Sequence, residues 1–278
     1  MVDPVQAFYD RLAADYHLIF ADWGSAIARQ AAVFDRLIEA SLCEAARSGA
    51  VRDLLDCACG IGTQALGLAT LGYRVTGSDL SPVAIARARQ QARRRRLELS
   101  FVVADMRALD QLVPGTFDVV LAADNALPHL VSDDDLAQAI RAIAAKLRPD
   151  GLFLASMRDY DDALARRPET WRARLLGPEG RRRIVQQVWE WSDPRHYRVH
   201  IYIEHETADG WRREHHVGCY RALTRAELTT ALQAGGLGAI SWLMPAETGY
   251  HQPIVLARKP PAVAPGSRRE RGGSKHCG

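Results

Sequence analysis

The sequence lacks a long apolar run, a paired set of cysteines and a strong net charge, and each absence excludes a class of protein. No stretch of 18 apolar residues exists, which argues against a membrane-spanning helix. The five cysteines are an odd number at scattered positions, so a reducing compartment is favoured over a disulfide framework. The first residues, Met1 to Pro4, lack the basic-then-apolar layout of a secretion signal. We therefore expect a cytoplasmic protein without a membrane segment.

The positive charge is concentrated at the end of the chain. Residues 259–278 carry a formal charge of +4, which leaves −1 for residues 1–258 out of a total of +3. A near-neutral folded part gives no general case for nucleic-acid binding. Its two basic runs, Arg93–Arg96 and Arg181–Arg183, are typical of solvated faces, with RNA contact as the alternative. The end of the chain is rich in proline, glycine, serine and arginine, which predicts disorder.

What is present is a globular composition and an alternation of short apolar strands with helices. The hydrophobic fraction of 47% is that of a folded protein. Helical spacing covers residues 4–47, with a break at residues 22–25. The pattern then predicts strands at 51–56, 73–78, 101–104, 117–122 and 152–156, and helices at 63–71, 81–96 and 132–147. This order is typical of an α/β fold with a parallel sheet covered by helices on both faces.

The rhythm changes after residue 158. Residues 168–180 are polar and irregular. Alternating segments then predict an antiparallel meander at 184–191, 196–206 and 211–220, followed by a helix at 224–234 and strands at 240–243 and 254–257. We therefore expect one domain over residues 1–258, with residues 168–220 inserted as a substrate lid and residues 259–278 as a disordered basic tail.

A glycine-rich loop follows the first predicted strand and opens the next helix, in the order Asp56-Cys57-Ala58-Cys59-Gly60-Ile61-Gly62. Glycines let the backbone turn tightly and approach a ligand at the carboxyl ends of the strands. A dinucleotide site fits this loop loosely, because a pyrophosphate would bind at the helix N-terminus. Asp56, however, would repel a pyrophosphate and attract a cation. Asp79 and Asp105 follow the next two strands, so the pattern favours a cationic adenosine ligand such as S-adenosylmethionine.

The run DCACGIGTQALGLATLGYRVTGSDLSPVAIARAR, residues 56–89, resembles the class I S-adenosylmethionine-dependent methyltransferases. Within that class the sequence is similar to the glycine N-methyltransferase and glycine/sarcosine N-methyltransferase group over about residues 5–258. The resemblance implies a Rossmann-like class I methyltransferase sheet with N-terminal helices and an antiparallel β lid insertion. It also implies S-adenosyl-L-methionine as cofactor. No metal is predicted, because Cys57 and Cys59 lack further ligands at zinc spacing.

The same resemblance implies which residues bind the cofactor. Asp79 would accept hydrogen bonds from both ribose hydroxyls, and Asp105 would accept from the adenine amino group. Arg29 would pair with the carboxylate of the methionine part, and His129 would lie near that end. The other implied positions are loop, adenine-stacking and N-terminal residues, namely Tyr9, Tyr16, His17, Asp56, Ala58, Gly60, Gly62, Leu80, Met106 and Ala123.

On the acceptor side the resemblance implies an arginine, an asparagine and several tyrosines. Arg158 would bind a substrate carboxylate with its planar fork, the alternative being a salt bridge to the acids that follow it. Asn125 would accept a hydrogen bond from the acceptor amine. The implied pocket tyrosines are Tyr202, Tyr220 and Tyr250. Phe20 stands where the group often has a tyrosine, which favours a larger or more methylated amine over glycine.

The resulting hypothesis is an N-methyltransferase acting on a small amino acid of the glycine, sarcosine or dimethylglycine type, with a betaine-type osmolyte as an end product. Such a transfer mainly needs orientation in a dry pocket. We expect Arg158, Asn125, Tyr202 and His129 to carry it. The alternatives are a methyltransferase for another small metabolite, with His129 as general base for an oxygen acceptor, an RNA-binding module that retains the fold, and an NAD-dependent dehydrogenase. Nothing in the sequence indicates an oligomeric state.

Overall fold

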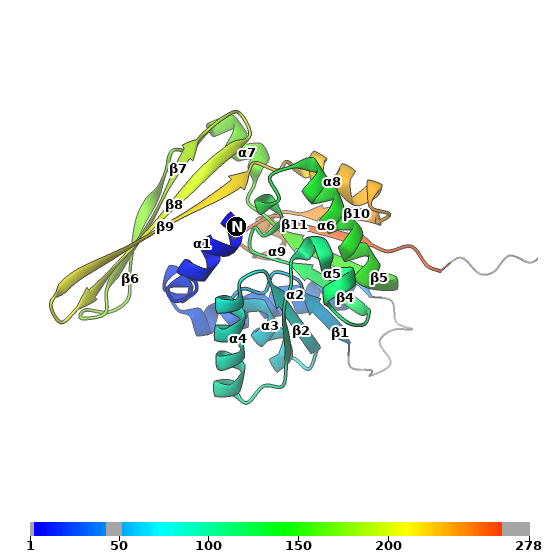
Figure 1. The fold of residues 1–278 in the computed structure, drawn as a ribbon, viewed down its shortest axis with the longest axis horizontal. Helices are drawn as coiled ribbons and strands as arrows, with labels where there is room; N and C mark the ends of the chain where they lie inside the picture. Colours follow the sequence, from blue (N-terminus) through cyan, green and yellow to red (C-terminus); the bar gives the residue numbers. More distant parts are fainter. Residues whose placement is uncertain (1–2, 43–51, 263–278) are drawn as a thin grey trace, which may run out of the picture.

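The computed structural model describes residues 3–42 and 52–262, and it contains a seven-stranded sheet and a separate four-stranded sheet (Figure 1). The strands of the larger sheet lie in the order β10-β11-β5-β4-β1-β2-β3. Their bounds are β1 (Asp53–Asp56), β2 (Arg74–Asp79), β3 (Ser100–Val103), β4 (Phe117–Ala122), β5 (Leu147–Ser156), β10 (Gly238–Leu243) and β11 (Ile254–Arg258). Neighbouring strands are parallel except in the two pairs that β11 makes. The expected α/β fold is therefore confirmed.

The order of the strands reverses at the centre of this sheet. From β1 the chain moves outward to β2 and β3, and it then returns to β4 on the other side of β1. Such a reversal opens a crevice at the carboxyl ends of the strands, where ligands bind in open α/β sheets. The register places Asp56 at the end of β1 between Gly77 of β2 and Leu121 of β4. The strand ends that carry the predicted site therefore meet at one edge.

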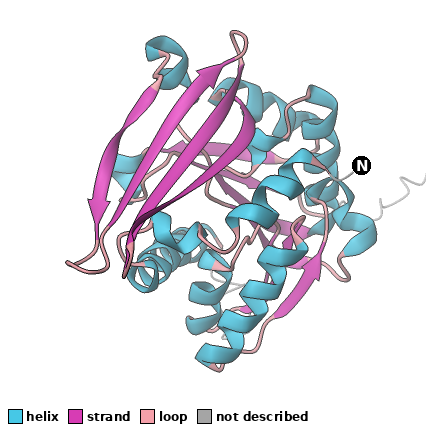
Figure 2. Ribbon diagram, turned by 60° about the vertical axis from the view of Figure 1, so that its left-hand side comes forward, coloured by secondary structure: helices cyan, strands magenta, loops and turns pink. Residues whose placement is uncertain are grey.

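Helices cover both faces of the sheet, because adjacent residues of its buried strands point into opposite cores (Figure 2). Leu54 packs in one core with Phe34 and Leu66, whereas Leu55 packs in the other with Ile140. Fully burying a leucine contributes about 1.5–3 kcal/mol. The first core involves α2 (Trp23–Ser41), α3 (Thr63–Thr70) and α4 (Pro82–Arg95), and the second involves α5 (Leu109–Leu112), α6 (Asp133–Lys146) and α8 (Arg225–Ala234).

Several helices begin at side-chain caps. The Ser81 hydroxyl accepts from the backbone N–H of Ala84, and Thr224 forms a reciprocal capping box with Glu227. The N-terminal segment is divided into two α-helices as expected, but the division lies at residues 13–22 rather than 22–25, because residues 23–25 already belong to α2. After α1 (Pro4–Leu12) and a short 3-10 turn at Tyr16–Ile19, the carboxylate of Asp22 caps α2. This break lets α1 turn toward the lid strand β9 (Gly210–Arg221) while it still contacts the start of α4, where the Ser81 hydroxyl donates to Asp10 at 2.6 Å.

The lid sheet is the antiparallel four-stranded sheet, in the order β6 (Thr170–Leu176), β7 (Arg183–Trp191), β8 (His196–Thr207) and β9 (Gly210–Arg221). It projects from the main domain beside α1 (Figure 1). Alternation along β8 buries Tyr197, Val199 and Ile201, which join the same core as Phe8 of α1. Residues between them face the other side, so the two faces of the lid sheet have different environments.

The structure corrects one expectation about the lid. Residues 168–180 were expected to be irregular, but β6 forms at Thr170–Leu176. Most of β6 is exposed, and it pairs with β7 from Thr170↔Val188 to Leu176↔Arg183. Its stability therefore comes from pairing with a neighbouring strand, which local composition does not reveal. Three short helices were also not expected, α5 (Leu109–Leu112), α7 (Tyr160–Arg166) and α9 (Pro245–Thr248).

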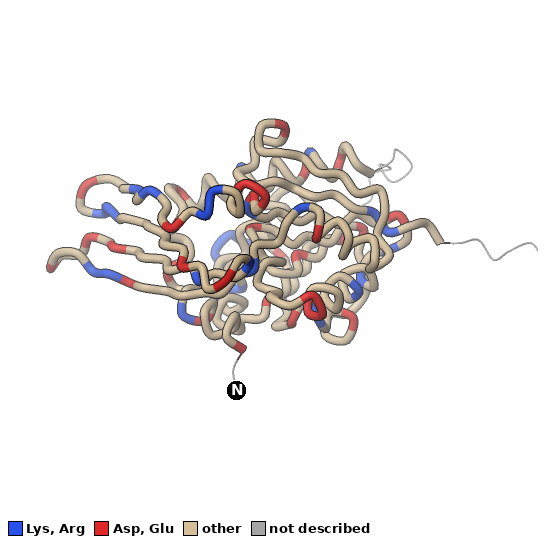
Figure 3. Tube along the Cα trace, turned by 90° about the horizontal axis from the view of Figure 1, so that it is seen from above, with Lys and Arg blue, Asp and Glu red and all other residues tan. Residues whose placement is uncertain are grey.

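Acidic and basic residues are interleaved over the described surface (Figure 3). Members of the basic run Arg181–Arg183 have partners inside the chain, since Arg182 pairs with Glu206 and Arg183 donates to the carbonyls of Leu18 and Ala21. Lys259 donates from Nζ to the carbonyl of Leu147 at 2.7 Å. Residues 263–278 of the expected tail lie outside the described residues, as do residues 43–51. Of the helices that the structure describes, none has both the length and the apolar character of a membrane span.

Candidate active site

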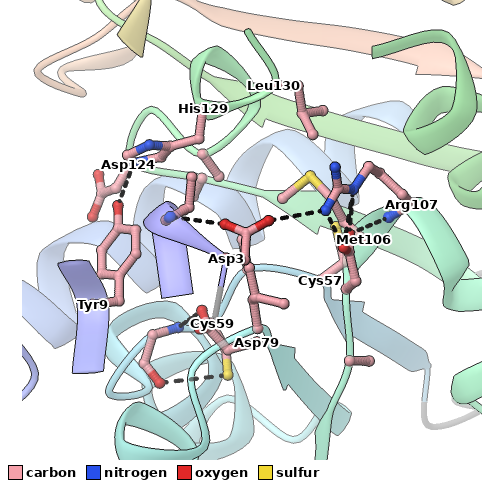
Figure 4. Close-up of a pocket in the computed structure, with 18 of the residues that line it drawn as sticks. Asp3, Tyr9, Cys57, Cys59, Asp79, Met106, Arg107, Asp124, His129 and Leu130 are labelled. Carbon is pink, nitrogen blue, oxygen red and sulfur yellow. Dashed lines mark hydrogen bonds and ion pairs between the residues drawn. The ribbon is translucent and has the colours of Figure 1, made fainter. Parts of the chain in front are cut away.

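A pocket opens at the carboxyl ends of β1, β2, β3 and β4, with residues of α1 over it (Figure 4). Its empty space is about 870 Å³ when counted out to its open mouth. The predicted cofactor residues that line it are Tyr9, Tyr16, Ala58, Gly60, Asp79, Leu80, Asp105, Met106, Ala123 and His129. The lining residues that sequence reasoning missed include Asp3, Thr63, Gln64, Arg107, Asp124 and Asp135.

The glycine-rich loop and Asp79 hold each other in place. Gly60 and Gly62 have φ angles of 52° and 95°, in the left-handed region that favours glycine. The N–H of Gly60 donates to Oδ2 of Asp79 at 2.8 Å, and the N–H of Ser81 donates to Oδ1 at 2.8 Å. Burial raises the pKa of Asp79, whereas these two amides oppose that shift. The carboxylate is thus fixed at the end of β2 with further lone pairs available to a ligand.

Asp56 is completely buried behind the loop and does not line the pocket. Neither of its carboxylate oxygens has a hydrogen-bond partner among the described residues. Burial raises the pKa of this carboxyl to about 8, and the Asp79 and Asp124 carboxylates add to the effect. An unpaired buried acid beside an acidic pocket suits a ligand that carries positive charge. S-adenosylmethionine, with its sulfonium and ammonium groups, fits these residues.

The predicted adenine contact Asp105 is part of an ion-pair network around Arg107 (Figure 4). Arg107 donates from Nη2 to Asp105 at 2.6 Å and from Nη1 to Asp135 at 2.8 Å. Its Nη2 also reaches Asp3, just before α1, at 3.2 Å. These bonds raise the pKa of Arg107 above its ordinary value. The network fixes Asp105 and ties the start of the described chain to the rim of the pocket.

At the opposite side of the pocket, Asp124 accepts hydrogen bonds from two buried side chains. Nε2 of Gln64 donates at 2.8 Å and the hydroxyl of Tyr250 at 2.5 Å. Both oxygens of Asp124 thus have a neutral donor, and His251 is the one basic side chain within the described ranges that forms a pair with it, at 3.4 Å. Tyr250, predicted as a substrate residue, therefore donates its hydroxyl hydrogen to Asp124, a carboxylate of the pocket lining, in this structure. Asp124 and Asn125 both adopt left-handed backbone, with φ angles of 55° and 70°.

Tyr9 and His129 form a bonded pair in the pocket wall. Nδ1 of His129 lies 3.0 Å from the Cys219 carbonyl, so Nδ1 carries the proton and donates to that oxygen. Nε2 then accepts from the Tyr9 hydroxyl at 2.8 Å. Burial lowers the pKa of His129 to about 3, which keeps the ring neutral. The pair leaves the Tyr9 oxygen as an acceptor toward the pocket.

The structure places four predicted cofactor residues outside the pocket lining. Arg29 lies on an exposed face of α2, while its neighbour Gln30 is buried. His17 is bonded to Arg87, with 2.8 Å between Nδ1 and Nη2. Gly62 is the N-cap residue of α3 and lies close to the Leu66 side chain. Asp56 lies on the side of the loop that faces away from the pocket. The contact between Arg29 and the cofactor carboxylate stays a prediction, and in this structure the Arg29 side chain is exposed rather than in the pocket lining.

A second cluster lies under the lid sheet, around Arg158 at the end of β5. Nη1 of Arg158 donates to the Tyr197 hydroxyl at 3.1 Å, and Nη2 donates to Oε1 of Gln187 at 3.3 Å. Its guanidinium also lies over the rings of Trp189 and Tyr220, at 4.9 and 5.1 Å from their centroids. The alternative salt bridge is not formed: Asp159 and Asp161 pair instead with Arg225, and Asp162 pairs with Arg166.

Asn125 connects the two clusters. Its side chain was expected to accept a hydrogen bond, but the group that it leaves without a partner is a donor. Its Oδ1 accepts from the backbone N–H of Arg158 at 3.0 Å and from the Tyr160 hydroxyl at 3.0 Å. The backbone donor identifies this atom as oxygen, so Nδ2 is the other end of the amide. Nδ2 is buried without a partner among the described residues. The free group of Asn125 is therefore a donor, which suits a carboxylate oxygen rather than an amine hydrogen.

Of the predicted substrate tyrosines, Tyr220 joins this cluster and Tyr202 does not. Tyr220 lies with its ring centroid 4.0 Å from that of His129. Tyr202 is on the other face of β8, stacked on His215 at 4.4 Å. Tyr197, five residues earlier, is the β8 tyrosine that faces Arg158. The strand alternation predicted two faces, and the buried series Val199, Ile201 and Ile203 is the signal that marks Tyr197 as inward.

The chain was compared with known proteins. Residues 54–151 match a family model described as a methyltransferase domain. A glycine/sarcosine N-methyltransferase from Parasynechococcus marenigrum is 31% identical over 143 residues, which cover 51% of this chain and 48% of that protein. The chain spans about half the length, or less, of the curated relatives it matches.

Two solved structures share the fold. The CcbJ methyltransferase from Streptomyces caelestis has a TM-score of 0.72 and 20% identity, covering 93% of this chain and 99% of that one. CalS10, an amino pentose methyltransferase from Micromonospora echinaspora, has a TM-score of 0.66 and 23% identity, covering 84% and 91%.

The reversed strand order, the glycine loop, the acidic strand ends and the match of residues 54–151 together identify a methyltransferase domain in this chain, with the fold of the class I S-adenosylmethionine-dependent methyltransferases. The chain resembles the glycine/sarcosine N-methyltransferases. The predicted fold class is confirmed, and the same similarities support the predicted cofactor, S-adenosylmethionine.

Proposed function

We propose that the protein transfers a methyl group to the nitrogen of a small amino acid whose carboxylate binds Arg158. The observation that carries the proposal is the surroundings of this arginine. Its guanidinium contacts two neutral oxygens and two aromatic faces, and none of the carboxylates in residues 3–42 and 52–262 is bonded to it. An arginine sequestered without an anion is costly, whereas a bound carboxylate would satisfy its fork.

The unpartnered Nδ2 of Asn125 supports the same proposal. A buried amide donor without an acceptor is unfavourable in the free protein, and an arriving carboxylate oxygen would remove that cost. Asn125 is tied to Arg158 through the Arg158 backbone N–H. Both donors therefore belong to one small region. In this proposal Asn125 and Arg158 hold the carboxylate end of the acceptor.

The chemistry needs orientation more than acid or base. S-adenosylmethionine, when bound, supplies a methyl group activated by its positively charged sulfur. The acceptor attacks as a neutral amine, and the proton of its ammonium form passes to water. Arg158 and Asn125 orient the acceptor, and the Tyr9 oxygen, its own proton donated to His129, accepts from the pocket side. The aromatic rings of Trp189, Tyr197 and Tyr220 exclude water around the carboxylate end.

Two other kinds of acceptor fit these residues less well. An oxygen acceptor would need a base, but Nε2 of His129 already accepts from Tyr9, and burial lowers the pKa of His129 to about 3. An amino sugar is the second candidate, because the likeness to the amino pentose methyltransferase CalS10 covers 84% of this chain. Arg158 favours the amino acid, since an amino sugar has no carboxylate. If dimethylglycine is accepted, the product is a betaine.

The test is a transfer assay with labelled cofactor and matched acceptors. Glycine, sarcosine and dimethylglycine are compared with glycinamide, which keeps the amine and removes the charge of the carboxylate, and with an amino sugar. We expect transfer to at least one of the three carboxylates at a kcat/KM at least about tenfold above that of glycinamide. Equal or faster transfer to glycinamide, or transfer to the amino sugar alone, would contradict the proposal.

A further inference from the structure

We infer that Gln187 of the lid strand β7 determines the charge of the acceptor: its neutral amide holds Arg158 in place without cancelling the positive charge of the guanidinium. The inference rests on the proposed function, and it names a residue that neither the sequence patterns nor the family resemblance singled out. Arg158 acts on the acceptor directly in this scheme. Gln187 acts through Arg158, so it is a positioning residue.

The contacts of Gln187 place it between the lid and the main domain. Oε1 accepts from Nη2 of Arg158 at 3.3 Å and from Nε1 of Trp189 at 3.5 Å. The Trp189 ring lies against the guanidinium, and the distance from Cζ of Arg158 to the ring centroid is 4.9 Å. One oxygen thus aligns both the arginine and the ring on which it stacks. Arg158 comes from the end of β5, so the contact also joins the lid sheet to the larger sheet.

Among the residues that the structure describes, the groups in contact with the guanidinium are neutral. The second acceptor, the Tyr197 hydroxyl, is itself bonded to the Tyr160 hydroxyl at 2.7 Å. Burial raises the pKa of Tyr197 well above its ordinary value, so this hydroxyl stays protonated. Two aromatic faces and two neutral oxygens stabilise a cation while leaving its full charge for a ligand. A carboxylate at position 187 would form a salt bridge of the same geometry and would neutralise the positive charge that the acceptor carboxylate needs.

Strand alternation provides a matched control next to this residue. Gln187 shares the inward face of β7 with the buried Val185 and Trp189. Gln186 is one residue earlier, on the other face, and is paired across the sheet with Tyr202. Gln186→Glu therefore adds the same negative charge to the same strand while pointing away from Arg158.

The experiment separates a charge role from a merely structural one. Gln187→Glu keeps the size of the side chain and strengthens its bond to Arg158. If Gln187 only tethers the lid, acceptor binding should survive this change. If Gln187 instead leaves the positive charge of Arg158 available to the acceptor, Gln187→Glu should weaken acceptor binding. Calorimetric titration of sarcosine into the variant loaded with S-adenosylhomocysteine should then show binding at least about tenfold weaker than in the wild type. Affinity for S-adenosylhomocysteine should be unchanged, and Gln186→Glu should match the wild type within about twofold.

A second readout is the preference between charged and neutral acceptors. In Gln187→Glu, the ratio of kcat/KM for sarcosine to that for sarcosine amide should fall at least about tenfold, through KM rather than kcat. An unchanged ratio, or the same fall in Gln186→Glu, overturns the inference about Gln187 alone. If the wild type binds neither sarcosine nor acetate, the proposed carboxylate site fails, and the inference about Gln187 fails with it. Binding of acetate without transfer to any amino acid leaves the carboxylate site and contradicts only the acceptor.

Discussion

At the strand ends of the main domain the site is built from carboxylates, whereas under the lid sheet it is built around one guanidinium. Asp79 is held by backbone amides of neighbouring loops, and Asp56 is completely buried with no cationic side chain bonded to it among the described residues. Arg158 is held by side chains of β7 and β8 that lie about 30 to 40 residues further along the chain. The two halves present opposite charges to what they bind.

The difference indicates how readily substitutions would alter the carboxylate half and the Arg158 half of the site. A carboxylate held by backbone amides stays in place as long as the loop keeps its conformation, so its position depends little on other side chains. The environment of the arginine depends on the identity of Gln187, Trp189 and Tyr197, each of which one substitution alters. We therefore expect cofactor recognition to be robust and acceptor recognition to be the half that mutations retune. The following predictions test this comparison, starting from the largest effect.

Asp56→Asn should stabilise the free protein at neutral and alkaline pH. Burial raises the pKa of Asp56 to about 8, above the ordinary value of about 3.9 in an unfolded chain. Below pH ~4 Asp56 is protonated in both the folded and the unfolded chain, so it does not lower the free energy of unfolding. As pH rises from there toward about 8, the free energy of unfolding of the wild type falls by about 1.4 kcal/mol per pH unit. The variant lacks this loss, so its advantage in urea unfolding should grow over the same range. A constant difference at all pH values would contradict the unpaired state of Asp56.

Arg158→Ala should abolish acceptor recognition while sparing the cofactor. We expect kcat/KM for the best amino acid to fall at least about 100-fold, because a charged hydrogen-bonding partner is removed from a desolvated site. The dissociation constant of S-adenosylhomocysteine, measured by calorimetry, should stay within about twofold. Arg167→Ala is the matched control, since Arg167 also stacks on a lid tryptophan, 4.6 Å from the Trp191 centroid, but lies exposed. A normal KM in Arg158→Ala would break the comparison between the two halves.

Asp79→Asn should produce the converse effect. Loss of a charge-assisted contact is expected to weaken S-adenosylhomocysteine binding about 10- to 100-fold. At saturating cofactor the KM for the acceptor should stay near that of the wild type. The exposed Asp110→Asn serves as a control for removal of one negative charge. A loss confined to acceptor binding would place Asp79 in the wrong half of the site.

The smallest effect concerns the two tyrosines of β8. Tyr197→Phe removes the hydroxyl that accepts from Arg158, and we expect KM for the acceptor to rise about 3- to 10-fold. Tyr202→Phe, on the other face, should change KM less than about twofold. Steady-state kinetics on the two variants decide between these positions, and a larger effect from Tyr202 would reverse the assignment of the faces.

Much of the cofactor half could be predicted from the sequence, because its determinants are local. Asp79 directly ends a strand, and Gly60 directly follows one, so both are placed by the order of strand, loop and helix. Arg107 was missed although it stands two residues after Asp105, close enough for a direct ion pair. Asp124 was missed because its left-handed backbone, which turns it into the pocket, is not visible in a pattern. Aspartate and asparagine tolerate that conformation best, which was the available signal.

The lid half could be predicted only in outline. Alternation correctly indicated antiparallel strands, but it does not state the register that brings Gln187 and Tyr197 to Arg158. Those contacts depend on how the lid sheet packs on α1 and on the end of β5, which is a property of the whole fold. For the same reason the partners of the Asn125 side-chain oxygen, which come from residues 158 and 160, could not be read from the sequence.

The consecutive left-handed residues Asp124 and Asn125 have a consequence for laboratory evolution. Each position costs about 1 kcal/mol that glycine would not cost. Glycine would remove that strain, but it would also leave buried donors without their acceptors, Gln64 and Tyr250 at position 124 and Tyr160 at position 125, at about 1–3 kcal/mol each. A library selected for heat resistance alone should therefore keep the original side chains at both sites. The frequency of glycine among the survivors would measure whether backbone strain or hydrogen bonding dominates at these two positions.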